Sequence, residues 1–407
     1  MNVLFLTMSK IRSIEERFIY TDLMRTFRDD GHKVYIFSPL DRREKRMTNI
    51  KLEGNVQIIF VHTLNVAKTN MIEKGIGQLS MEYLYINAVK KNCKGVKFDL
   101  ILYSTPPITF LNVIRYVKKF SPQAKTYLML KDIFPQNALD IGMLKASGIR
   151  GLIYNFFRNK EKKLYALSDY IGCMSPANVE YVLTHNPEIP AERVEIAPNS
   201  VELSIEAVEP INDEKLKVRE KYGLPTDKPI FIYGGNLGKP QGIDYLIKCL
   251  DANKSRKDCH FVVVGNGTEY KKIDGWYRAN KGCCVNLMQR LPKEDYDMLV
   301  RSCDVGLIFL DHRFTIPNYP SRLLSYLEYK MPIICATDPN TDIGSIAEEN
   351  GYGYWCESVK PEDFTALVDK MLTSDRKAMG EKGYDYLKQN YTVQNTYNII
   401  MNHFKNV

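Results

Sequence analysis

Short runs of apolar, β-branched residues alternate with longer segments of helical periodicity along most of the 407-residue chain. In the first half, these runs predict strands at residues 3–7, 33–38, 56–62, 100–104, 126–130, 170–175 and 194–197. The amphipathic segments predict helices at residues 15–30, 78–91, 108–119, 149–167 and 177–184. Regular alternation of strand and helix is typical of a parallel, doubly wound sheet.

A second series of strands follows a charged, turn-rich segment, residues 212–228. These strands are predicted at residues 230–233, 260–264, 285–288, 305–310 and 333–336, whereas the helices after about residue 361 have no predicted strand partner. The fold expected is therefore α/β, with two Rossmann-like domains and a boundary near residues 205–228. Two such domains facing each other would leave a cleft, the usual place for a ligand.

The predicted domains have the following limits. Residues 1–205 form the first domain and residues 206–390 the second. The terminal helix, predicted at residues 394–404, is expected to fold back across the boundary, so that residues 391–407 pack on the first domain.

The segment 311–337 joins two apolar strands through a predicted helix that starts after Pro320. Ser321 is expected to cap this helix by accepting backbone N–H groups. Free N–H groups and the adjacent Arg322 would favour an anion there, and Glu328 would lie roughly 10 Å further along the helix. A nucleotide diphosphate with its ribose hydroxyls on Glu328 fits this spacing. The alternative is an ordinary packed helix whose Arg322 and Glu328 are solvated.

Two glycine-rich turns follow strands of the second series. The first, GGNLG, contains Gly235, and the second contains Gly265 and Asn266. Glycines allow backbone N–H groups to approach a phosphate closely. Cations stand at three strand or helix ends of this domain, namely Lys239, Arg290 and Arg322. The sequence therefore predicts an anion site at one sheet edge, whereas the GGNLG spacing does not fit the GxGxxG pattern of NAD-binding proteins.

The cysteine content and the lengths of the apolar runs indicate the compartment in which the protein acts. The nine cysteines show neither a disulfide framework nor a metal-binding pattern, which indicates a reducing cytoplasm. The first apolar run is too short for a signal peptide, and no run approaches the roughly 20 apolar residues of a spanning helix.

Charge is uneven along the chain. Residues 1–200 hold 29 Lys/Arg and 19 Asp/Glu (+10), which leaves 27 and 29 (−2) for residues 201–407. A basic half attracts nucleic acid, anionic lipid or an anionic substrate. Residues 81–97 interleave aromatics with lysines, as in an interfacial membrane helix, although a core-facing helix with a solvated basic side fits equally well. No motif that reads nucleic-acid bases is present, so a nucleic-acid partner is not expected.

Several motifs together resemble a known family. GGNLGKPQG, VVVGNGTE, and PSRLLSYLE followed by MPIICAT resemble the donor domain of family 4 retaining glycosyltransferases, which have the GT-B fold. The segments ERFIYTDLMRTFRDDGHKVYIFSP, STPP, KDIFPQNA, SDYIGCMS and APNSVE resemble the acceptor domain of the same family. The resemblance spans nearly the whole chain and is strongest to the branch that builds bacterial capsule, O-antigen or exopolysaccharide units.

The resemblance implies roles for individual residues. Glu328 matches the ribose-binding Glu of the family, whereas the first Glu of that motif is Pro320 here, so backbone near residues 315–319 would have to replace its sugar contact. The phosphate-binding Arg and Lys of the family fall at Asn236 and Gln241. The donor-binding residues expected are therefore Gly235, Asn236, Gln241, Gly265, Asn266, Arg290, Ser321, Leu323 and Glu328.

The catalytic and acceptor-binding residues match the family pattern less closely than the donor-binding residues do. The histidine-bearing loop of the family appears as Lys131-Asp132, so no catalytic His is assigned. Asp132 is expected to orient the acceptor hydroxyl, or else to cap the helix near Pro135. Lys239 and Arg322 are expected to replace the missing phosphate-binding charge. In the loop after the first strand, Ser9, Lys10 and Arg12 are expected to bind an acceptor diphosphate. The alternative is that these residues form a solvated basic loop.

The function expected is transfer of a hexosyl or N-acetylhexosaminyl group, with retention, from a nucleotide diphosphate sugar to a polyprenyl-diphosphate-linked saccharide. A UDP-sugar is expected ahead of a GDP-sugar. No further cofactor and no metal are expected, because Asp338 and Asp342 lie in a turn-rich stretch in which they would cap loops. The chain would act in the cytoplasm, at the periphery of the inner leaflet. The alternatives are a GT-B-fold sugar-nucleotide epimerase and a non-catalytic GT-B binding protein.

Overall fold

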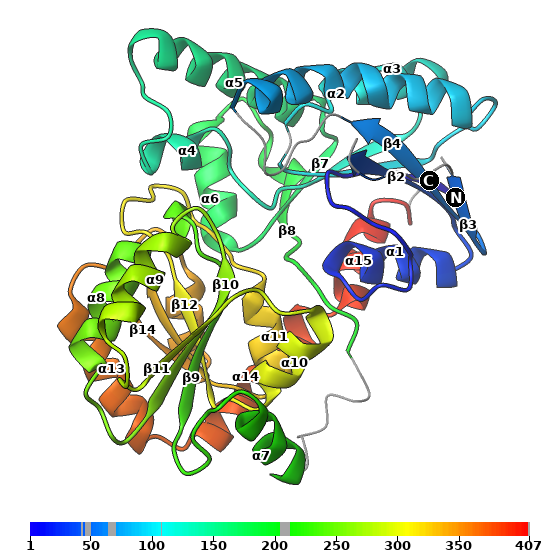
Figure 1. Cartoon of the computed structure of the whole chain (residues 1–407). Coiled ribbons are helices and arrows are strands. Elements are labelled where there is room, and N and C mark those ends of the chain that lie inside the picture. The colour runs from blue at the N-terminus through cyan, green and yellow to red at the C-terminus, as the bar shows by residue number, and fades with distance from the viewer. Residues whose placement is uncertain (42–43, 45–49, 64–70, 107, 204–211, 406–407) are drawn as a thin grey trace. The chain divides into compact units, whose positions relative to one another are not determined.

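The computed structural model describes residues 1–41, 44, 50–63, 71–106, 108–203 and 212–405. The chain divides into two units, one made of Met1–Glu202 with Thr392–Val407 and the other of Leu203–Tyr391. Residues 204–211, part of the segment in which the sequence predicts a domain boundary, lie outside the described residues, as does Pro107 of the STPP motif. Each unit is built on one sheet, as the colours of Figure 1 show.

The first unit contains an eight-stranded sheet of order β3-β4-β2-β1-β5-β6-β7-β8. Its strands are β1 (Asn2–Leu6), β2 (Lys33–Asp41), β3 (Ile50–Glu53), β4 (Val56–Thr63), β5 (Leu100–Ser104), β6 (Lys125–Met129), β7 (Tyr170–Cys173) and β8 (Val194–Ile196). Neighbouring strands are parallel except β3 and β4. The sequence did not predict β3, because it is short and mostly exposed and becomes a strand only by pairing with β4.

The helices of the first unit are α1 (Ile19–Asp29), α2 (Met71–Asn92), α3 (Leu111–Phe120), α4 (Gln136–Asp140), α5 (Gly148–Leu167), α6 (Pro176–His185) and α15 (Val393–Asn402), with a 3₁₀ turn η1 (Ala191–Arg193). The terminal helix α15 packs on α1, where the ring centroids of Phe27 and Tyr397 lie 4.8 Å apart. The Tyr397 hydroxyl also lies 3.0 Å from His32 Nε2, and Ile400 is fully buried. α15 therefore completes the core of the first unit from a distant part of the sequence.

The segment 81–97, a candidate interfacial helix, is helical only as far as Asn92, where α2 ends, and this part of α2 faces the core. Met81, Tyr85 and Val89 of α2 are buried at helical spacing, and Tyr85 donates a hydrogen bond to the Thr7 carbonyl at 2.7 Å. The lysines of this segment occupy its solvated side. The alternative interpretation of residues 81–97 was thus the correct one.

The second unit contains a parallel six-stranded sheet of order β11-β10-β9-β12-β13-β14. Its strands are β9 (Ile230–Asn236), β10 (His260–Asn266), β11 (Val285–Met288), β12 (Val305–Phe309), β13 (Ile333–Thr337) and β14 (Gly353–Glu357). Its helices are α7 (Asn212–Lys221), α8 (Ile243–Asn253), α9 (Tyr270–Ala279), α10 (Lys293–Arg301), α11 (Arg322–Glu328), α12 (Ile343–Glu349), α13 (Pro361–Thr373) and α14 (Arg376–Asn390), with a 3₁₀ turn η2 (Lys239–Gln241). Figure 1 shows α8, α9 and α13 on one face of this sheet and α10 and α11 on the other. The predicted α/β class with two Rossmann-like sheets is confirmed.

Two predictions about the second unit were wrong. The turn-rich segment 212–228 begins with helix α7, in which buried Arg219 donates to the Asp304 carboxylate at 2.6 Å and to the Ser302 carbonyl at 2.8 Å. The helices after residue 361 do have a strand partner, because β14 adds to β13 and α13 packs against both strands. Neither feature has a strong local pattern: α7 is charged throughout, and β14 has no β-branched residue.

Candidate functional site

The two glycine turns of the second unit meet at the carboxyl edge of its sheet. β9 and β10 remain paired through Gly235 and Gly265, and a Cβ atom on Gly265 would lie 1.8 Å from the Gly235 carbonyl oxygen. Gly235 has a φ of +133°, which L side chains rarely adopt. Both positions therefore require glycine. Gly235, Asn236 and Asn266 are exposed at this edge, where α/β proteins bind ligands.

The first turn is braced by neutral side chains. The Gln241 Oε1 atom accepts hydrogen bonds from Asn236 Nδ2 at 2.9 Å and from the Gly238 N–H at 3.2 Å. The Tyr233 hydroxyl donates to the Asn236 carbonyl at 2.7 Å. Asn236 and Gln241, expected as donor-binding residues, are thus bonded to each other in this structure, and their contact with a donor stays a prediction.

Arg322 lies against this same turn. Its guanidinium carbon is 4.4 Å from the centroid of the Tyr233 ring, within the range of a cation–π interaction. Two guanidinium atoms lie 3.3 Å from the position that a Cβ atom of Gly235 would occupy. The Arg322 Nη1 atom is buried and has no hydrogen-bond partner among the described residues. The structure thus brings Arg322 and Gly235 together and leaves a cationic donor available beside an exposed turn.

The close packing under this turn depends on two tyrosines. A Cβ atom on Gly234 would lie 2.0 Å from the Tyr296 hydroxyl oxygen. The Tyr326 hydroxyl accepts a hydrogen bond from the Gly234 N–H at 3.3 Å and donates to the Ile232 carbonyl at 3.1 Å. Neither tyrosine was singled out from the sequence. Their periodicity within α10 and α11 is that of ordinary core positions.

The start of α11 differs from the prediction. Ser321 has helical angles (φ −63°, ψ −17°), and its side chain makes no cap hydrogen bond. The Leu323 N–H bonds to the Pro320 carbonyl at 3.2 Å, and the Leu323 side chain is fully buried. The predicted Ser321 cap was therefore wrong, because backbone carbonyls already satisfy the first N–H groups. Glu328 ends this short helix with only 3% of its surface exposed.

Lys239 and Arg290 are exposed, and neither makes an ion pair or a side-chain hydrogen bond within the described part of the chain. Lys239 belongs to η2, directly after the glycine turn, whereas Arg290 follows β11, which is separated from β9 by β10. Lys239 therefore shares the turn that Arg322 contacts. Convergence of Arg290 on the same ligand stays a prediction.

The start of the segment 311–337 also reaches the glycine turn, through Asp311, which the sequence did not single out. The Asp311 N–H donates to the Pro240 carbonyl at 3.0 Å, and the Asp311 carboxylate accepts hydrogen bonds from Arg313 at 2.8 and 2.7 Å. Burial opposes ionisation of Asp311, but the bonds and charge of Arg313 hold the pKa of Asp311 below its ordinary value. The signal available in the sequence was the Asp-His-Arg run immediately after a buried strand.

The loop that would contact the sugar is tied to the turn after β13. The Asn318 N–H donates to Thr341 Oγ1 at 3.0 Å, and Asn340 Nδ2 donates to the Phe314 carbonyl at 2.7 Å. Asp338 accepts hydrogen bonds from the backbone of Asn340 and Thr341, which confirms its predicted capping role, and burial raises the pKa of Asp338 to about 6. Asp342 stands at the start of α12, where its side chain makes no hydrogen bond that caps this helix, and its capping of a loop stays a prediction.

In the first unit, Asp132 and Lys131 follow β6. The Asp132 carboxylate accepts a hydrogen bond from Asn137 Nδ2 at 2.7 Å, and Thr105 Oγ1 accepts from both backbone N–H groups, at 3.1 Å from Lys131 and 3.3 Å from Asp132. Burial raises the pKa of Asp132 to about 6. The residue that caps α4 is Pro135, so Asp132 supports this loop without being the helix cap.

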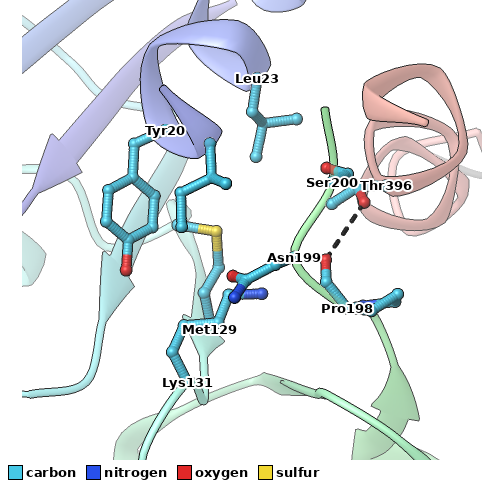
Figure 2. A pocket seen from close by; sticks show the side chains of 9 residues that line it. Tyr20, Leu23, Met129, Lys131, Pro198, Asn199, Ser200 and Thr396 are labelled. Atoms are coloured by element: carbon cyan, nitrogen blue, oxygen red, sulfur yellow. Dashed lines mark hydrogen bonds between the residues drawn. The ribbon is translucent and has the colours of Figure 1, made fainter. Parts of the chain in front are cut away.

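The Lys131 side chain turns into a small pocket that the sequence did not indicate. Figure 2 shows Lys131 beside Met129, Asn199 and Tyr20, between the ends of β6 and β8 and helices α1 and α15. The Lys131 ammonium donates to the Ala197 carbonyl at 3.1 Å, and burial lowers the pKa of Lys131 to about 7. The Asn199 Oδ1 atom is buried without a hydrogen-bond partner among the described residues.

The predicted acceptor loop is occupied by internal ion pairs. Lys10 Nζ lies 2.5 Å from Asp41 and 2.8 Å from Glu44, and Arg12 pairs with the same Glu44 carboxylate. The Ser9 N–H donates to Thr7 Oγ1 at 3.0 Å. Contact of these residues with an acceptor stays a prediction and would require the pairs to open.

No cluster of three or more metal-ligating side chains occurs in the part of the chain that the structure describes. Among the same residues, no helix has the length and apolar character needed to cross a membrane. All nine cysteines are free thiols.

Two units, each built on a Rossmann-like sheet, define the GT-B fold of glycosyltransferases, and the glycine turns lie at the carboxyl edge of the second sheet. HepE of Anabaena, solved in complex with UDP-glucose, has this fold with a TM-score of 0.71 and 14% identity over 100% of both chains. Residues 214–386 match the model of the family "Glycosyl transferases group 1". The chain therefore contains a group 1 glycosyltransferase domain, which covers most of the second unit.

Two relatives are similar in sequence. WbjE of Pseudomonas aeruginosa, named a probable glycosyltransferase, is 23% identical over 328 residues, which cover 80% of this chain and 78% of WbjE. WcaI of Escherichia coli (strain K12), which bears the name of a colanic acid biosynthesis glycosyl transferase, is 24% identical over 276 residues, 67% of this chain and 65% of WcaI.

Proposed function

We propose that this protein is a retaining glycosyltransferase that moves a sugar from a nucleotide diphosphate sugar to a polyprenyl-diphosphate-linked saccharide during synthesis of a bacterial surface polysaccharide. The observation that carries the proposal is the contact of the Arg322 guanidinium with the exposed Gly235 turn inside a group 1 domain. An available cationic donor beside exposed backbone is the arrangement that a diphosphate requires. Two similarities support this assignment: HepE binds UDP-glucose, and WcaI is named for colanic acid biosynthesis.

The chemistry assigned to the chain follows from charge that develops on the leaving diphosphate. As the sugar–oxygen bond breaks, negative charge grows on the diphosphate, and Arg322 and Lys239 would stabilise it from a fixed position. The incoming hydroxyl would approach from the same face and give its proton to the diphosphate. Asp132 would hold that hydroxyl as a hydrogen-bond acceptor, while Glu328 would bind the ribose hydroxyls.

The donor is tested by thermal unfolding of the purified chain with UDP, GDP, ADP and their common sugar conjugates. We expect UDP or a UDP-sugar to raise the melting temperature. A ligand at a hundred times its dissociation constant stabilises by about 2.7 kcal/mol, a shift of a few degrees for a chain of this size. Glu328→Gln, which keeps the side-chain volume, should lose most of the shift. The absence of a shift with every nucleotide would contradict the proposed donor site.

One observation favours a second candidate function, non-catalytic binding of a sugar nucleotide. The positions of the family's phosphate-binding Arg and Lys are the neutral pair Asn236 and Gln241, which bond to each other. Incubation with the donor that binds, with and without a membrane lipid extract as the source of acceptor, separates the candidates. Acceptor-dependent release of the nucleotide diphosphate supports the transferase. Binding without release supports a binding protein, and conversion of the sugar with donor alone would indicate an epimerase.

The expected location is the cytoplasmic face of the membrane, in peripheral contact with the inner leaflet, because a polyprenyl-linked acceptor is held there. Fractionation of cells that produce the chain tests this location. A membrane-bound pool that high salt releases is expected for peripheral contact, since salt screens attraction to anionic lipids.

A further inference from the structure

Four large apolar side chains are exposed on α5 and the turn before it. Their exposed fractions are 56% for Met143, 70% for Leu152, 43% for Ile153 and 46% for Phe156. Leu152 and Phe156 are four residues apart on α5, so they lie one above the other on one face of the helix. Ile153 borders that face. The first half of α5 thus exposes three large apolar side chains on its solvent side, where a surface helix is ordinarily polar.

The opposite side of α5 is firmly packed. The Tyr154 hydroxyl donates to Gln136 Oε1 at 2.7 Å, and the ring centroids of Phe157 and Phe134 lie 5.2 Å apart. Buried Glu161 accepts a hydrogen bond from Arg158 at 2.6 Å. α5 also packs beside α3 (Figure 1). The apolar face therefore belongs to an anchored helix. On that face, Phe156 contacts the Phe157 ring of the same helix, with ring centroids 5.4 Å apart, and still has 46% of its surface exposed.

The charges that residues 141–160 carry have one sign, although Lys160 also pairs with Glu82 of α2 at 3.7 Å. Between Asp140 and Glu161 the sequence contains no acidic residue and four basic ones, which are Lys145, Arg150, Arg158 and Lys160. Lys145 and Arg150 are exposed, and the Lys160 ammonium lies 5.5 Å from the centroid of the Phe156 ring. Exposed aliphatic and aromatic side chains among cations match the interface of an anionic bilayer, where the apolar groups enter the acyl boundary and the cations meet lipid phosphates.

We propose that Met143, Lys145, Arg150, Leu152, Ile153 and Phe156, here named the α5 surface, bind the surface of an anionic phospholipid bilayer. Leu152 and Phe156 enter the headgroup–acyl boundary, and Lys145 and Arg150 contact lipid phosphates. The α5 surface gives a structural basis for the membrane location proposed above, and it rests on the proposed function for its biological purpose. Its physical basis is independent of the nucleotide site.

The test is co-sedimentation of the full chain with vesicles of phosphatidylcholine, with and without phosphatidylglycerol. We expect the chain to sediment with phosphatidylglycerol vesicles and to be released by high salt. Leu152→Ser/Phe156→Ser should weaken binding at least about tenfold, and Lys145→Gln/Arg150→Gln should weaken it while reducing its salt dependence. Met298→Ser is the matched control, because Met298 is similarly exposed but lies near Asp295 and Asp297 on α10; it should bind as the wild type does.

Three results would overturn the proposal. They are absence of binding to phosphatidylglycerol vesicles, equal binding by the Leu152→Ser/Phe156→Ser variant, and self-association of the wild type that this variant abolishes without any vesicle binding. The last result would assign the α5 surface to a second copy of the chain. The thermal shift given by the nucleotide should persist in every variant, which verifies folding and separates failure of this proposal from failure of the proposed donor site.

Discussion

The guanidinium carbon of Arg322 lies 4.4 Å from the centroid of the Tyr233 ring, so the first residue of α11 is stacked on the last aromatic residue of β9. This stacking fixes a cation beside the glycine turn, and no acidic side chain of the described residues pairs with it. A carboxylate at that place would compete with a phosphate, whereas a π face holds the guanidinium and leaves its N–H groups available.

We expect Arg322→Lys to weaken binding of the nucleotide diphosphate by about tenfold or more, because lysine keeps the charge but loses the planar donor fork and the stacking. If the chain turns over a sugar nucleotide, kcat should fall roughly a hundredfold. Calorimetric titration and initial rates measure the two effects. Arg301→Lys is the control, since Arg301 also lies over a tyrosine ring, that of Tyr329 at 5.1 Å, but on α10. Equal losses in both variants would refute a specific role for Arg322.

Gln241→Lys should strengthen nucleotide diphosphate binding several-fold at low salt, because it adds a cation on the turn that Arg322 contacts. The gain is offset in part by loss of the hydrogen bonds that Gln241 accepts from Asn236 and Gly238. Gln241→Met serves as the control, since it removes the same bonds without adding charge. If both variants bind the nucleotide equally well, the diphosphate does not lie at this turn.

Gly265→Ala should destabilise the second unit by about 2–5 kcal/mol, because its Cβ would lie 1.8 Å from the Gly235 carbonyl oxygen and the backbone there cannot yield without opening the β9–β10 pairing. Gly275→Ala is the matched control. A Cβ on Gly275 meets nothing within 4 Å, and alanine in α9 should stabilise by roughly 0.5–1 kcal/mol. Urea unfolding of both variants measures the difference, and a neutral Gly265→Ala would contradict the close approach of the two turns.

Because the Lys131 amine is buried, we expect the stability of the folded chain to depend on pH. Burial lowers its pKa from the ordinary 10.5 to about 7, so between these values the folded chain binds fewer protons at this amine than the unfolded chain does. Its contribution to stability therefore rises with pH from about 7 upward. We expect the melting temperature of the wild type to gain on that of Lys131→Met between pH 7 and pH 9. Parallel pH curves for the wild type and Lys131→Met would refute a buried amine.

The apolar pattern by itself determined the class of the fold. Runs such as residues 100–104 and 305–310 are almost entirely apolar because parallel strands are covered on both faces, and this pattern can be recognised in the sequence alone. The glycine turns at Gly235 and Gly265 could also be predicted from the sequence, because glycine is the residue that adopts the positive φ angles found there. The sequence predicts domain limits at residues 205/206 and 390/391, and the units of the structure have their limits at residues 202/203 and 391/392.

Only the tertiary structure decided which of the charged and neutral side chains are free. Lys10 and Arg12 were candidates for an acceptor site, yet both pair with Glu44, more than thirty residues away. Likewise, Arg322 became the strongest candidate through a ring on a different strand, while the expected Ser321 cap does not form. β3 and β14 exist because a neighbouring strand completes their hydrogen bonds. Periodicity reports which face of an element is buried, but hydrogen bonds and ion pairs depend on atoms that the fold brings together from distant positions, and no local pattern encodes them.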